Sequence, residues 1–140
     1  MLECLIIGDS IAVGTHQFKP ECVAYAKGGI NSWQWLNQNV GKTPLLAKTV
    51  IISLGSNDHK YVNTESELRT IRQLTKADRV YWVLPAGNHP KSNVSIQYIQ
   101  LTIKEIAREY GDIVLPISNL QKDGIHPSWA GYKDIAQKTK

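Results

Sequence analysis

Ser10, Asp123 and His126 are side chains whose types and spacing could together carry out nucleophilic chemistry. A serine hydroxyl becomes a nucleophile when an imidazole takes its proton, and a carboxylate then has to orient that imidazole. The Asp-x-x-His spacing lets one short loop present Asp123 and His126 together. A turn followed by a helix starting at Pro127 would explain Asp123 but not His126. Ser10 alone would be interpreted as a helix N-cap, so the combination is what indicates a catalytic triad.

Acyl transfer by such a serine also needs hydrogen-bond donors that stabilise the oxyanion of the tetrahedral intermediate. Asn57 follows an apolar run and a glycine, and its side-chain amide is one candidate donor. The backbone N–H groups of Ser10 and Gly29 are the other two. Each position also has a structural interpretation, Asn57 as a turn residue and Gly28-Gly29 as a left-handed turn. The sequence leaves open whether Gly28 or Gly29 supplies the donor.

Short apolar runs that alternate with helical periodicity indicate how the chain would position these residues. Four of the five runs are nearly continuous, as expected of strands buried on both faces of a parallel sheet. The alternation predicts a single α/β domain over residues 1–140, a flavodoxin-like three-layer α/β/α sandwich around a five-stranded parallel sheet. The expected strands are Leu2–Ile7, Cys22–Ala26, Thr49–Leu54, Arg79–Leu84 and Ile113–Pro116.

Five helices are expected between and after the strands. The clearest has apolar residues at spacings of three and four from Ile96 to Tyr110, with Gly111 as its C-terminal cap. Thr64-x-x-Glu67 predicts a capping box at the start of the third helix. The others are expected from Ser10 toward Phe18 and at about Ser32–Asn39, Glu65–Thr75 and Ser128–Thr139. Every candidate catalytic residue then lies at the carboxyl ends of the strands, where open α/β sheets place their sites.

The four segments that carry these residues resemble the conserved blocks of the SGNH hydrolase family, also called GDSL-type esterases and lipases. The matching segments are Gly8-Asp9-Ser10, Gly29, Gly55-Ser56-Asn57-Asp58 and Asp123-Gly124-Ile125-His126-Pro127, within a resemblance that spans residues 5–131. It implies ester hydrolysis through an acyl-enzyme, with Ser10, His126 and Asp123 as the triad and Ser10, Gly29 and Asn57 as the oxyanion hole. The first block reads GDSI rather than GDSL, and Asp9 receives no chemical role.

The chain is short for that family, so we expect a shallow, open site and a short acyl group. An O-acetyl ester, carried by a small molecule or an acylated polysaccharide, is the first expectation. A cell-wall (peptidoglycan) hydrolase with the same triad and a non-catalytic binding module of the same fold are the alternatives. Candidate substrate contacts are Trp129, His89 and Asn88. Trp33 and Trp129 could stack on a sugar or pack on the sheet, whereas Trp35 and Trp82 are expected in the core.

Composition limits the partners and cofactors. The net charge is +4, from 16 Lys and Arg against 12 Asp and Glu, and the basic residues are scattered. We therefore interpret them as solvated surface residues and expect no specific nucleic acid, although a mild preference for anionic surfaces stays open. No metal and no organic cofactor are expected, because the four histidines lack zinc-like spacing and no G-x-G-x-x-G or phosphate-binding loop is present. The sequence does not indicate an oligomeric state.

Two further expectations concern the cell compartment. Cys4 and Cys22 have no metal-binding spacing, and we interpret them as buried free thiols in a reducing compartment. No apolar stretch is long enough to span a membrane, and the opening residues lack the pattern of a secretory signal. The chain is therefore expected to be cytoplasmic as synthesised and not inserted in a membrane.

Overall fold

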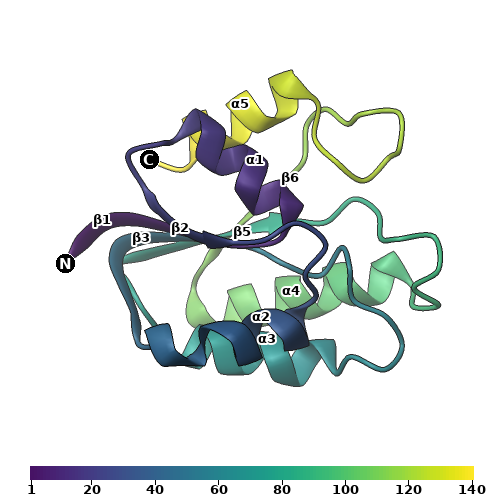
Figure 1. Ribbon diagram of the computed structural model, residues 1–140, viewed down its shortest axis with the longest axis horizontal. Helices are drawn as coiled ribbons and strands as arrows, with labels where there is room; N and C mark the ends of the chain where they lie inside the picture. The colour runs from purple at the N-terminus through teal and green to yellow at the C-terminus, as the bar shows by residue number, and fades with distance from the viewer.

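A parallel β-sheet forms the centre of the computed structural model, which describes residues 1–140 (Figure 1). The strand order is β2-β1-β3-β5-β6, and every pairing is parallel. This is the order of flavodoxin-like sheets, so the predicted fold class is confirmed. The strands are β1 Leu2–Gly8, β2 Val23–Ala26, β3 Leu45–Ser53, β4 Thr75–Lys76, β5 Arg79–Leu84 and β6 Ile113–Pro116.

The bounds of β1 and β2 differ from the expectation by one residue each, and two further strands differ by more. β3 begins at Leu45, four residues before the predicted Thr49, and its first residues alternate between buried and exposed. The two-residue strand β4 was not expected; it pairs with Leu45 and Leu46 at this early end of β3. The continuous apolar run starts only where both faces of β3 are covered, which explains the late predicted start.

Helices cover both faces of the sheet, as Figure 1 shows. Helices α1 (Ser10–Phe18) and α5 (Trp129–Lys138) pack together on one face. The opposite face carries α2 (Ser32–Asn39), α3 (Thr64–Gln73) and α4 (Ile96–Tyr110), with a short 3₁₀ helix at Val40–Lys42. No helix has both the length and the apolar character needed to cross a membrane.

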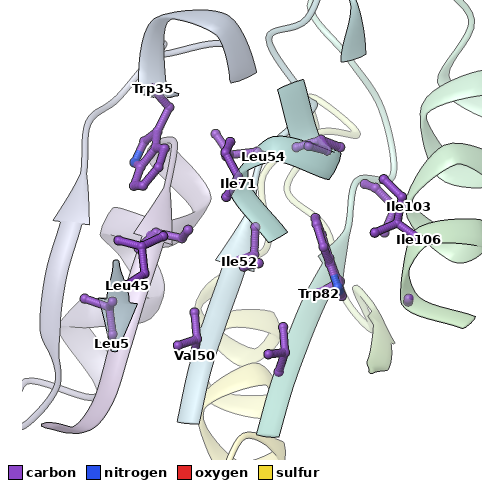
Figure 2. Packing of buried hydrophobic residues seen from close by; sticks show 14 of the residues in the cluster. Leu5, Trp35, Leu45, Val50, Ile52, Leu54, Ile71, Trp82, Ile103 and Ile106 are labelled. Carbon is purple, nitrogen blue, oxygen red and sulfur yellow. The ribbon is translucent and has the colours of Figure 1, made fainter. Parts of the chain in front are cut away.

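The core lies in two layers, because neighbouring residues of a strand point to opposite faces of the sheet. In β1, Leu5 and Ile7 belong to the layer under α2, α3 and α4, whereas Ile6 belongs to the layer under α1 and α5. Figure 2 shows the first layer, where Trp82 of β5 lies near Ile103 and Ile106 of α4. Trp35 and Trp82 are fully buried, as expected. Full burial of each aliphatic neighbour such as Ile103 stabilises the fold by roughly 1.5–3 kcal/mol.

The helix caps confirm one prediction and correct another. Gly111 ends α4 with a left-handed backbone, φ 72°, as the sequence indicates. The predicted capping box of Thr64 and Glu67 is wrong, because Asn63 is the N-cap of α3 and its side chain accepts the Ser66 N–H at 3.2 Å. Thr64 is buried instead and its hydroxyl donates to Asp58.

Cys4 and Cys22 form a disulfide, so the expectation of free thiols is wrong. The register between β1 and β2 sets Leu5 opposite Val23, which brings the preceding residue of each segment together. Their Cα atoms are 4.9 Å apart, within the range that a disulfide bridges. The bond closes 18 residues of chain that include α1, and it joins the two strands at the end of the sheet opposite Ser10.

Candidate active site

Ser10 lies where β1 ends and α1 begins. Gly8, with φ 144°, lets β1 approach Ser53 of β3 so closely that any Cβ at this position would collide with the Ser53 carbonyl. The Asp9 N–H donates to that carbonyl at 3.0 Å, and the Asp9 side chain then caps α1. Ser10 therefore starts the helix with its side chain at the carboxyl end of the sheet, and the helix N-terminus favours developing negative charge there.

His126 and Asp123 complete a hydrogen-bonded chain with Ser10. The Ser10 Oγ lies 2.8 Å from His126 Nε2, and His126 Nδ1 lies 2.6 Å from Asp123 Oδ2. The second carboxylate oxygen, Oδ1, accepts the backbone N–H groups of Ile125 and His126 at 2.9 and 3.0 Å. The hydrogen bond from His126, helped by these two, lowers the pKa of Asp123 to about 2. With an ionised Asp123 beside Nδ1, the proton of a neutral imidazole belongs on Nδ1 and Nε2 can accept from Ser10.

The loop that carries the histidine is fastened to the start of α5. The Gln121 N–H donates to the His126 carbonyl at 2.8 Å, and the Gln121 side chain donates to the Pro127 carbonyl at 2.9 Å. Ser128 caps α5 by accepting the Gly131 N–H at 3.2 Å. These bonds hold His126 in place although the imidazole is partly exposed.

Asn57 and Gly29 lie together on the neighbouring loops. The Asn57 side-chain amide donates to the Ile30 carbonyl at 3.1 Å, which leaves its second N–H for another acceptor. Gly29 has φ 78° in the turn that precedes α2, and it lines the same cavity as Asn57. A Cβ on Gly28 would lie 3.9 Å from the Cβ of Ser10. The turn therefore places Gly28 beside the candidate nucleophile and Gly29 in the cavity that Asn57 also lines.

The buried side chain of Asp58 connects these loops through hydrogen bonds. It is fully buried; Oδ1 accepts the Ser32 N–H at the start of α2 at 2.8 Å, and Oδ2 accepts the Thr64 hydroxyl at the start of α3 at 2.7 Å. The bond to Ser32 fixes the segment that contains Gly29, while the chain neighbour of Asp58 is Asn57. Sequence reasoning did not assign a role to Asp58, although it is the last residue of the matching segment Gly55-Ser56-Asn57-Asp58.

Asp9 is a second fully buried carboxyl group, next to Ser10. Its Oδ1 accepts the Ile11 N–H at 3.0 Å and lies 3.4 Å from the Ser53 hydroxyl, whereas Oδ2 has no hydrogen-bond partner. Burial, with a smaller effect from the Asp58 carboxylate, raises the pKa of Asp9 to about 7. The contacts of Asp9 support the loop structurally.

The predicted substrate contacts fall in different places. The Asn88 amide donates to the Ser92 hydroxyl and, at 2.8 Å, to the Val94 carbonyl, so it braces its own loop. His89 lines the cavity that contains Asn57 and Gly29. Trp129 is largely exposed and its ring lies edge-on to Phe18 of α1, 5.3 Å between centroids. Trp33 is also exposed, on α2, so neither indole belongs to the core.

The cavity beside Asn57 and Gly29 includes residues that sequence reasoning did not single out. It has a volume of about 280 Å³, and its lining contains His59 and Lys91 but no hydrophobic residue. Both side chains come from loops at the carboxyl ends of strands. A search of those loops for polar residues would have found them, but they carry no pattern of their own.

No family model matches the chain, and no curated protein matches it in sequence. Several solved structures share its fold. A GDSL-like lipase from Bacteroides thetaiotaomicron is 18% identical with a TM-score of 0.71, over 96% of this chain and 84% of that one. The catalytic domain of peptidoglycan O-acetyltransferase A from Streptococcus pneumoniae is 19% identical with a TM-score of 0.66, over 99% and 96%. An acetyl xylan esterase is 15% identical with a TM-score of 0.64, over 96% of each chain. The chain thus has the fold of SGNH and GDSL-type proteins.

Proposed function

We propose that the protein is a serine esterase of the SGNH type that hydrolyses short-acyl carboxylic esters, above all O-acetyl esters on carbohydrates. The observation that carries this proposal is the chain of hydrogen bonds from Ser10 through His126 to Asp123, at 2.8 and 2.6 Å. A serine that only caps a helix needs neither partner. The fold shared with esterases and lipases supports the same activity.

In the proposed reaction, Ser10 Oγ attacks the ester carbonyl while His126 Nε2 takes its proton. The ionised Asp123 orients the imidazole and stabilises the imidazolium. The backbone N–H groups of Ser10 and Gly29 and the Asn57 amide donate to the oxyanion. His126 then protonates the departing alcohol, and a water molecule, deprotonated by His126, releases the acid from Ser10.

The cavity beside the candidate oxyanion hole supports a short acyl group. The cavity next to Asn57 has no hydrophobic lining, so a long acyl chain would bury its methylene groups against polar side chains and gain little. A polar, hydroxylated alcohol such as a sugar suits that lining better. The similarity of fold to an acetyl xylan esterase agrees with this substrate class.

Action on an acylated cell-wall polymer is a second candidate. It is favoured by the shared fold with the catalytic domain of a peptidoglycan O-acetyltransferase. Release of acetate from O-acetylated peptidoglycan, compared with release from acetylated xylan at equal acetyl content, separates the two candidates.

Hydrolysis of p-nitrophenyl acetate, butyrate and octanoate by the wild type and by Ser10→Ala tests the proposal. The expected result is highest kcat/KM for acetate and a loss of about 10⁴-fold or more in kcat for Ser10→Ala. Ser66→Ala is the matched control, because Ser66 is an exposed serine on α3 that belongs neither to the candidate triad nor to the candidate oxyanion hole. A wild type that neither hydrolyses these esters nor reacts with a fluorophosphonate would instead be a binding module.

A further inference from the structure

The polar cavity beside the candidate oxyanion hole is rich in hydrogen-bond donors. Gly29 and Asn57 form part of its wall, and His59, His89 and Lys91 form another part. None of its lining residues is acidic. The nearest carboxylate of the Asn57 loop, Asp58, is buried, and both of its oxygens already accept hydrogen bonds.

Backbone hydrogen bonds fix which nitrogen of the two histidines can donate. His59 Nδ1 accepts the Tyr61 N–H at 3.2 Å, and His89 Nδ1 accepts the Lys91 N–H at 3.3 Å. A neutral imidazole whose Nδ1 accepts a hydrogen bond carries its proton on Nε2. Both rings therefore offer an Nε2–H donor in the neutral state, and the Lys91 ammonium adds a positive charge.

The walls of the cavity are joined to one another. The His89 N–H donates to the Ser56 carbonyl at 3.0 Å, and the Lys60 N–H donates to the Ser92 carbonyl at 3.1 Å. Asn88 holds the turn after β5 through its bonds to Ser92 and Val94. The two histidines and Lys91 thus stand on loops that are tied across the cavity, which limits the cost of ordering them around a ligand.

Positive charge continues on both sides of this cavity. A neighbouring hollow of about 260 Å³ is lined by His59, Lys60 and Lys91. Another, of about 130 Å³, is lined by Lys27 and Gly29. Neither contains an acidic residue, so the local potential favours an anion although the charges elsewhere are scattered.

We propose that this cavity binds an oxyanion, such as a carboxylate or a phosphate, that the ester substrate carries close to its scissile bond. The inference rests on the proposed esterase function, because Gly29 and Asn57 belong to both sites. It narrows the substrate class from neutral acetyl esters to esters of acidic alcohols or of dicarboxylic acids.

Matched pairs of esters test the proposal. Phenyl acetate is compared with 4-acetoxybenzoate, whose charge is on the alcohol side, and with 4-acetoxybenzenesulfonate as a second oxyanion. Phenyl propionate is compared with phenyl hydrogen succinate, whose charge is on the acyl side. Each kcat/KM is divided by the hydroxide-catalysed rate of the same ester. At least one anionic ester is expected to exceed its neutral partner by about threefold to fivefold, mainly through KM, and less so at high salt.

Lys91→Gln is the diagnostic variant, and Lys104→Gln, exposed on α4, is its control. Lys91→Gln is expected to lower kcat/KM for the anionic ester more than for its neutral partner, and so to remove the preference, whereas Lys104→Gln is expected to leave both values unchanged. Equal rates for every charged and neutral pair, with Ser10-dependent turnover intact, would overturn the anion site and leave the esterase function standing.

A binding measurement keeps the inference testable if turnover is not found. In Ser10→Ala, titration with 4-acetoxybenzoate is expected to shift the imidazole NMR signals of His59 and His89. Titration with phenyl acetate is expected to leave these signals unchanged. In the Ser10→Ala background, Lys91→Gln is expected to weaken the binding of 4-acetoxybenzoate that these shifts report. Shifts that are the same for both esters, or that do not depend on Lys91, would overturn the proposal whatever the catalytic result.

Discussion

Asp58→Ala tests whether one buried carboxylate holds the two loops of the candidate oxyanion hole. The substitution would leave the Ser32 N–H and the Thr64 hydroxyl buried without their acceptor. An unsatisfied buried donor costs about 1–3 kcal/mol, so the two donors together are expected to lower the free energy of unfolding by about 2–6 kcal/mol. Urea unfolding, followed by far-UV circular dichroism, measures this loss.

Two milder variants separate the structural from the catalytic consequence. Thr64→Val removes only one hydrogen bond to Asp58 and is expected to cost about 1–2 kcal/mol. Asp58→Asn keeps an acceptor for the Ser32 N–H, so it is expected to fold, but to move Asn57 and the Gly29 turn. In Asp58→Asn, kcat is expected to fall while KM changes little. Stability of Asp58→Ala within 0.5 kcal/mol of the wild type, roughly the scale of an ordinary surface substitution, would refute this role of Asp58.

Other residues yield four further predictions. Asn57→Ala is expected to lower kcat by about 10²–10³-fold, as loss of one oxyanion donor does, in steady-state ester hydrolysis. Asp123→Asn is expected to lower kcat by about 10⁴-fold while leaving the secondary structure unchanged. The Cys4→Ser/Cys22→Ser double variant is expected to lose about 3 kcal/mol in urea unfolding, from the loop-closure entropy of 18 residues. Burial raises the pKa of Asp9 from 3.8 to about 7, so the protonated form favours folding, and stability is expected to decrease as pH rises from about 4 to 7.

Each of these predictions has a control or a contrary outcome. The control for Asn57→Ala is Asn37→Ala, on the exposed side of α2, which should leave kcat unchanged. A wild-type kcat for Asp123→Asn would mean that the Asp123 carboxylate takes no part in the mechanism. Equal unfolding curves for the double cysteine variant and the wild type would mean that the disulfide does not stabilise the fold. In Asp9→Asn, the fall in stability between about pH 4 and 7 should disappear; if it persists, another group causes it.

The fold was predictable chiefly from its central strands, whose apolar runs are buried. β5 and β6 have their predicted bounds. Five of the six residues of β5 are buried, whereas no residue of the edge strand β6 is fully buried. The early part of β3 escaped prediction because Leu46 and Lys48 are exposed there and interrupt the run. Burial on both faces therefore made the central strands visible in the sequence, whereas the edge strand β6 was recognised from its apolar residues without such burial.

Features that depend on register or on loop geometry could not be predicted. The disulfide between Cys4 and Cys22 follows from the pairing of β1 with β2, which the spacing of the two cysteines does not reveal. The motif of Thr64 and Glu67 fits a capping box, but Thr64 instead bonds to a buried carboxylate from another loop. A tertiary hydrogen bond to Asp58 takes the place of the local capping bond here, because a buried carboxylate needs hydrogen-bond donors.

The candidate site also contains some residues that the sequence reveals and others that only the folded structure reveals. The types and spacing of Ser10, Asp123 and His126 predicted their association, and the structure brings them within hydrogen-bond distance. His59 and Lys91 were not singled out, because they lie in loops whose path depends on bonds between the ends of β3 and β5. Asp123 and His126 were recognisable because they share one short loop and complement the serine at the end of β1, whereas His59 and Lys91 have no such pattern.

Formation of an acyl-enzyme on Ser10 is the most direct test of the central claim. Wild-type protein is mixed with p-nitrophenyl acetate, quenched in acid within the first turnover and analysed by intact and peptide mass spectrometry. The account predicts one acetyl group on the peptide that contains Ser10, and none in Ser10→Ala. Acetylation elsewhere in the chain, or full turnover by Ser10→Ala, would contradict it.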